Sequence, residues 1–186
     1  MSHKKLGGVM TIKKFATVFF LLTISIIPLQ ATAPVPRQSP ELKFLDGGGR
    51  EVQLSSFKGK VVVVEFLFLR SDHCMRVAQT LNKLNAELGP RGLQTVGILF
   101  GQNANGIMVN QVMQALKLTY PMGYSSPDQV DTFLGRQGKE TLNIPQIVVI
   151  DKAGVIRAQN GGQYDPNLEN EDSLRSLLLG LLKKGA

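Results

Sequence analysis

The chain has 186 residues, of which 43% are hydrophobic and 19% are charged, a balance that suits one globular domain with a sizeable core and gives no sign of disorder. Its net charge of +7 is concentrated at the start: four of the 21 Lys and Arg residues and none of the 14 acidic residues precede position 32, so the rest carries +3. The remaining basic residues are scattered and form no stripe with interleaved aromatics, so no nucleic-acid partner is expected.

The first 31 residues have the layout of a secretory signal peptide. Two lysine pairs precede an apolar run over residues 15–29, and small residues follow at Ala31 and Ala33. A retained membrane anchor is the alternative, but the run is shorter than the roughly 20 residues of a spanning helix, and Pro28 interrupts its end. We therefore expect a signal peptide over residues 1–31 and export to the periplasm or cell envelope. Membrane contact is expected only through an uncleaved leader.

The segment after the leader changes from proline-rich to β-like. Residues 32–40 are expected to form a linker, so that one domain covers residues 41–186. Alternating patterns at residues 42–45 and 51–54 flank an Asp-Gly-Gly-Gly turn at residues 46–49. This arrangement predicts an N-terminal β-hairpin.

Strand and helix patterns then alternate. Residues 61–69 are apolar on both faces apart from Glu65, which is typical of a central strand in a covered sheet. Helical periodicity over residues 74–88 is followed by a strand at 93–100 and a helix at 105–118. The order strand, helix, strand, helix predicts parallel strands joined by right-handed crossovers.

The C-terminal part predicts a hairpin and a closing helix. Residues 120–127 are expected to be irregular, and residues 128–136 to form a short helix. The apolar segment 147–150 and the segment 155–158 are joined by an Asp-Lys-Ala-Gly turn, which predicts an antiparallel pair. An amphipathic helix is expected over residues 168–184.

This order of elements resembles the thioredoxin fold, and two motifs resemble its redoxin branch. Residues 54–64 read L-S-S-F-K-G-K-V-V-V-V, similar to the family pattern L-x-x-x-x-G-K-V-V-x-V, and Ile144-Pro145 leads through a short apolar strand to D-K-A-G. The resemblance covers residues 42–184 and includes exported thiol-disulfide oxidoreductases of the TlpA/ResA type and the alkyl hydroperoxide reductase/thiol-specific antioxidant group. It implies an α/β fold, a thioredoxin-like three-layer sandwich with a mixed central sheet and an extra N-terminal β-hairpin.

Cys74 is the single cysteine of the chain. In the oxidoreductases the strand ends in W-C-x-x-C, and the resemblance places Arg70 on the tryptophan, Ser71 on the nucleophilic cysteine and Cys74 on the resolving cysteine. A hydroxyl has no S–S chemistry, so the dithiol cycle within one chain is impossible. One cysteine in an exported protein leaves a buried thiol, a reactive thiol or an intermolecular partner.

Peroxiredoxins are the other template within the resemblance. They present one thiolate in a P-x-x-x-T/S-x-x-C run, assisted by a distant arginine. Ser71 and Cys74 fit the end of that run, but Leu67 stands at the position of the proline and Pro145 at that of the arginine. The chain completes neither template.

Three candidate site residues belong to one short segment. Cys74 is a candidate nucleophile because a helix N-terminus favours a thiolate, or else a buried thiol on the apolar helix face. Ser71 is a candidate N-cap, or a hydrogen-bond donor to the thiolate or to a bound peroxide. His73 either transfers protons near neutral pH or is an ordinary surface residue.

Two more candidates follow from the resemblance. Glu65 stands six residues before Ser71, at the spacing of the buried acid that assists proton transfer in thioredoxins. The alternatives for Glu65 are a place near the sheet edge or a pair with a lysine. Pro145 resembles the cis-proline that lies beside the thiol, whereas a trans-proline would simply start a strand.

Two functional hypotheses remain open. In the first, which we favour from the sequence, Cys74 exchanges with a thiol or disulfide protein partner, or reduces a peroxide through a sulfenic acid that an external thiol restores. In the second, the domain is a degenerate thioredoxin-fold binding or scaffold module that holds an extended peptide near Pro145. A fully covered sulfur would argue for the second. No organic cofactor is expected, and no metal, because His73 is the only histidine outside the leader.

Overall fold

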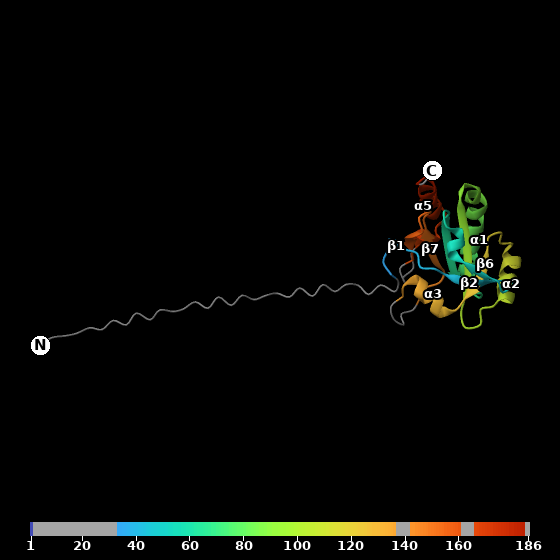
Figure 1. Cartoon of the computed structure of the whole chain (residues 1–186), viewed down its shortest axis with the longest axis horizontal. Coiled ribbons are helices and arrows are strands. Elements are labelled where there is room, and N and C mark those ends of the chain that lie inside the picture. The colour runs from blue at the N-terminus through green and yellow to red at the C-terminus, as the bar shows by residue number, and fades with distance from the viewer. Residues whose placement is uncertain (2–32, 137–141, 161–165, 185–186) are drawn as a thin grey trace.

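The computed structural model describes Met1 and residues 33–136, 142–160 and 166–184. The predicted signal peptide, apart from Met1, lies outside the described residues. Within them, no helix is long and apolar enough to cross a membrane. The described chain folds into one sheet flanked by helices (Figure 1).

A mixed sheet of eight strands forms the centre of the domain, in the order β1-β8-β7-β4-β5-β6-β2-β3. The pairs β4–β5 and β5–β6 are parallel, and the other neighbouring strands are antiparallel. The strands are β1 (Arg37–Gln38), β2 (Lys43–Asp46), β3 (Glu51–Gln53), β4 (Val61–Leu67), β5 (Leu93–Phe100), β6 (Met122–Ser125), β7 (Gln146–Ile150) and β8 (Val155–Gln159). The predicted mixed sheet and the β2–β3 hairpin are confirmed.

Helices cover both faces of this sheet, so the predicted three layers are present. One apolar cluster joins one face of the sheet to α1, α2, α4 and α5, and a second joins the opposite face to α3 and β2. The helices are α1 (Asp72–Leu88), α2 (Gly106–Leu116), α3 (Pro127–Leu134), α4 (Pro166–Glu169) and α5 (Glu171–Lys183), with short 3-10 turns at Leu54–Phe57 and Gly89–Arg91. Burial on both faces explains why the β4 sequence is almost continuously apolar.

Strand β6 lies inside the segment that was predicted to be irregular, so that prediction is wrong. β6 pairs in parallel with β5 and antiparallel with β2. A Cβ atom added to Gly123 would lie 2.4 Å from Phe44 Cδ2 and 2.5 Å from Leu45 O. Glycine therefore permits the close approach of β2 to β6.

The N-terminal segment also contributes to the sheet. Arg37 and Gln38, within the stretch expected to be a linker, pair with β8 as β1. Just before them, the Ala33 N–H donates to Leu134 O at 3.1 Å, and one Arg37 Nη donates to Phe133 O at 2.9 Å. These bonds satisfy carbonyl groups at the end of α3 that the helix itself leaves unpaired.

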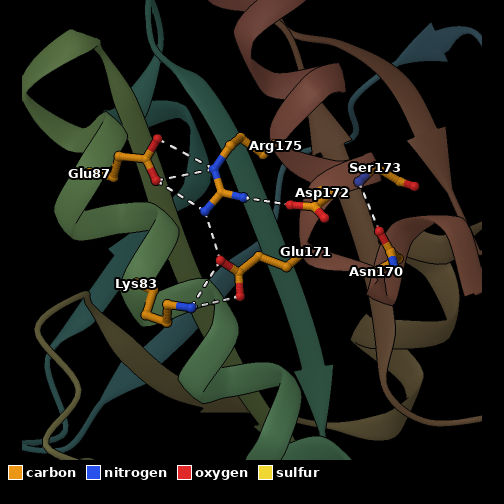
Figure 2. A network of polar contacts seen from close by, with 7 residues as sticks. All are labelled: Lys83, Glu87, Asn170, Glu171, Asp172, Ser173 and Arg175. Atoms are coloured by element: carbon orange, nitrogen blue, oxygen red, sulfur yellow. Dashed lines mark hydrogen bonds and ion pairs between the residues drawn. The ribbon is translucent and has the colours of Figure 1, made fainter.

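The predicted closing helix is divided into α4 and α5. Asn170 starts α5, because its Oδ1 accepts the Ser173 N–H at 3.0 Å. Figure 2 shows that Arg175 of α5 then reaches Glu87 of α1, while Lys83 of α1 reaches Glu171. Salt bridges on the surface therefore link α5 to α1 without involving α4.

Candidate functional site

The end of β4 and the first turn of α1 position Ser71 and Cys74. Ser71 is the N-cap of α1, and its Oγ accepts the Cys74 backbone N–H at 3.2 Å. The Ser71 carbonyl accepts the Met75 N–H at 3.0 Å, which closes the first helical turn. The side chain of Ser71 is partly exposed, whereas Cys74 points into the core.

Cys74 is fully buried, with 0% of its surface exposed. Burial raises the pKa of its thiol, and the negative charge of Glu65 raises it further. Hydrogen bonds from the Ser71 hydroxyl and the Phe68 backbone only partly offset this rise in pKa. The thiol thus stays protonated to a higher pH than a free cysteine, although it lies at a helix N-terminus.

Glu65 lies in the middle of the sheet, opposite Gly97 of β5 and Ile147 of β7. It is 0% exposed, and neither carboxylate oxygen has a hydrogen-bond partner within the described residues. Burial raises its pKa well above the ordinary value, the charge of Glu169 adds to this rise, and the Tyr120 hydroxyl opposes it. Neither alternative, an edge position or a lysine pair, fits this environment.

Tyr120 is a further member of the site that the sequence did not indicate. Its side chain is 1% exposed, and its hydroxyl donates a weak hydrogen bond to Ala78 O of α1 at 3.4 Å. Burial and the neighbouring Glu65 raise the pKa of the phenol well above its usual value. Tyr120 therefore adds a third buried acid with a raised pKa to the group formed by Cys74 and Glu65.

His73 contacts Glu169, the second residue that the sequence did not indicate. His73 Nε2 lies 2.5 Å from Glu169 Oε2, which makes an ion pair when the imidazole is protonated. The carboxylate side chain is 6% exposed and the imidazole 37%. The last residue of α4 is thereby placed against the first turn of α1.

Pro145 lies at the carboxyl end of β4, one residue before the Gln146–Phe66 pair. The Ile144–Pro145 peptide bond is cis, and Pro145 itself is buried. Phe68 lies at the same edge of the sheet, is 43% exposed, and packs on Phe100 with ring centroids 4.7 Å apart. This edge therefore presents an aromatic surface together with the Ser71 hydroxyl.

The described residues contain no group of three or more His, Cys, Asp or Glu side chains that could hold a metal ion.

The fold and the Ser-x-x-Cys segment define a thioredoxin-like protein of the redoxin class. The AhpC/TSA family matches residues 35–159, and the chain belongs to that family. Glutathione peroxidase 1 of Mus musculus is 33% identical over 84 residues, which is 44% of this chain and 41% of the relative, and the Rattus norvegicus protein matches to the same extent. The chain thus spans about two fifths of the length of these curated relatives.

Solved structures share the fold at low sequence identity. A putative protein disulfide isomerase from Bacteroides thetaiotaomicron has a TM-score of 0.68 and 22% identity, over 86% of this chain and 96% of that one. A putative thiol:disulfide interchange protein DsbE from Chlorobium tepidum has a TM-score of 0.66 and 19% identity, over 80% and 98%. The predicted fold of the thiol-disulfide oxidoreductases is confirmed.

Proposed function

We propose that this protein is an exported AhpC/TSA-family member that binds a protein partner at the carboxyl edge of its sheet and has lost the thiol–disulfide cycle. One observation carries the proposal: serine occupies the partly exposed position of the motif, and the remaining sulfur is fully covered. Export rests on the signal-peptide pattern of residues 1–31.

The covered sulfur counts against both redox reactions considered from the sequence. Thiol exchange and peroxide reduction require an accessible thiolate. Cys74 lacks both access and a low pKa, because burial blocks approach to the sulfur and raises the pKa of its thiol. Ser71 is accessible but cannot form a disulfide. The geometry therefore favours the binding module over the redox protein.

The binding surface would run along the carboxyl ends of three neighbouring strands. Phe68 follows β4 and packs against Phe100 of β5 with the two rings tilted. A cavity of about 420 Å³ continues this edge beyond β5 and β6, with Gly101, Tyr124 and Gln129 in its lining. An apolar aromatic contact beside a cavity with polar groups suits an extended peptide segment that carries an apolar side chain.

One-cysteine redox chemistry is the second candidate, favoured by the buried carboxyl of Glu65 near Cys74. Deprotonated Glu65 would take the proton of the Cys74 thiol, as the resemblance to thioredoxins suggests. The thiolate would then attack a peroxide, giving Cys74 sulfenic acid and an alcohol. Two external thiols would restore Cys74, with release of water and an external disulfide.

Alkylation and oxidation of Cys74 test the two candidates against each other. The folded protein should resist iodoacetamide across neutral and mildly alkaline pH, and should form no sulfenic acid with hydrogen peroxide by mass spectrometry. The same chain in urea is the positive control for thiol reactivity. Stoichiometric sulfenic acid in the folded protein would overturn the binding-module proposal in favour of redox chemistry.

A further inference from the structure

Helix α4 is too short to be stable by itself. It contains four residues, Pro166–Glu169, and such a helix is not stable without tertiary contacts. It packs against α5, and two further contacts lie toward the core and α1. Leu168 is 6% exposed and belongs to the same apolar cluster as Cys74, and Glu169 contacts His73.

The Glu169 carboxylate lies near the buried acid as well as near the imidazole. His73 directly precedes Cys74, so the Glu169 contact is made in the helical turn that carries the sulfur. The charge of Glu169 also acts on Glu65, whose two oxygens are buried and have no hydrogen-bond partner within the described chain. The end of α4 is thus close to both buried groups.

We propose that α4 is a latch that keeps Cys74 covered, and that the contact between Glu169 and His73 holds α4 in this closed position. This inference goes beyond the binding function, because it concerns what closes the thiol rather than what the protein binds.

Although α4 packs against α5, α5 is held to α1 by contacts that do not involve α4. α5 has its own N-cap in Asn170 and its own charged links to α1 through Glu171 and Arg175 (Figure 2). Opening α4 would therefore withdraw Leu168 and Glu169 without detaching α5. Local opening of this kind costs less free energy than global unfolding.

Two matched substitutions test the latch in the full chain. Glu169→Gln keeps the shape of the side chain but removes its charge, and native-state alkylation of Cys74 by iodoacetamide at one alkaline pH should become about tenfold faster. Glu171→Gln lies two residues away and weakens the Lys83 and Arg175 links instead. Its alkylation rate should stay within about twofold of the wild-type rate.

A second readout separates local opening from unfolding. Urea titration followed by circular dichroism should show that Glu169→Gln is still fully folded without urea, which is the condition of the alkylation assay. Leu168→Ala should also accelerate alkylation, since it removes the apolar contact of α4. Equal rates in Glu169→Gln, Glu171→Gln and the wild type would overturn the latch. The wild-type rate alone tests the binding-module proposal, whereas the ratios between variants test the latch.

Discussion

Glu65 of β4 and Gly97 of β5 lie opposite each other in the parallel part of the sheet. A Cβ atom added to Gly97 would lie 3.1 Å from Met122 Cγ and 3.3 Å from Tyr120 Cε2. The missing side chain therefore gives room for the Tyr120 ring next to the buried carboxyl. The buried Glu65 thus lies opposite a glycine whose position leaves space for Tyr120 and Met122.

Gly97→Ala should lower the free energy of unfolding by about 1–2 kcal/mol, because the added methyl group crowds a packed core. Urea unfolding measures this. Gly180→Ala in α5 is the matched control: a Cβ there meets nothing within 4 Å, so a gain of about 0.5–1 kcal/mol is expected from helix propensity. A stabilising Gly97→Ala would contradict the close packing of Tyr120.

Glu65→Gln should change how stability depends on pH. The raised pKa of Glu65 means that the folded state keeps a proton that the unfolded state loses above about pH 4.3. The contribution of Glu65 is therefore fully present below that pH and is lost as the pH rises toward the folded pKa. Urea unfolding at pH 4 and pH 8 should show that the wild type loses at least about 1 kcal/mol relative to Glu65→Gln.

Glu51→Gln is the control for that pH comparison. Lys43 lowers the pKa of Glu51, so its contribution has the opposite sign: it is present above the unfolded pKa and is lost as the pH falls. Parallel pH profiles for the two glutamine variants would show that Glu65 is ionised in the folded protein.

Ser71→Cys should create a disulfide with Cys74. The two positions are three residues apart at the start of α1, a separation at which side chains meet. Mass spectrometry after oxidation should show the loss of two hydrogens per chain. The reduced variant should reduce insulin disulfides. Asp72→Cys, two residues from Cys74, should do neither. A folded Ser71→Cys that never closes the disulfide would count against the assignment of Ser71 to the first motif position.

Phe68→Ser should weaken binding of an apolar peptide selected from a library on the folded protein. The reason is the loss of an exposed ring that is supported by Phe100. Ile107→Ser is the control, since Ile107 is 72% exposed on α2. Equal affinity of both variants, measured by calorimetry, would exclude Phe68 from the binding surface.

Arg175→Ala should lower the urea midpoint, and the loss should shrink in high salt. Arg175 contacts Glu87, Glu171 and Asp172 at 2.7–3.2 Å, and surface ion pairs are screened by added salt. Lys183→Ala in the same helix should have little effect. A salt-independent loss would point to packing of the arginine side chain rather than to its charge.

Local pattern predicted most of the fold, because the buried strands and α1 have strong periodicity in the sequence. β6 escaped prediction for a physical reason: Pro121, Gly123 and Pro127 read as irregular, and the strand exists only because β5 and β2 pair with it. The division between α4 and α5 depends on the side chain of Asn170, which the continuous apolar pattern does not reveal.

The site was predictable only where it is local in sequence. The N-cap role of Ser71 was predicted from its place at the start of the helical pattern. A buried acid at Glu65, six residues before Ser71, was suggested by the resemblance to thioredoxins, with a sheet-edge position or a lysine pair as the alternatives. Tyr120 and Glu169 reach the site only through folding, one from a loop before β6 and the other from a four-residue helix. The helix N-terminus suggested a lowered thiol pKa, but burial outweighs it.

Ala33 is fixed against the end of α3, and Leu29, the last residue of the apolar leader run, stands four residues before it. An extended chain gains about 3.5 Å per residue, so these residues span at most about 14 Å. If the predicted leader stayed in a membrane, a segment of at most about 14 Å would join it to the domain. The domain would lie close to the lipid surface with little freedom to reorient, and removal of the leader would release it to diffuse.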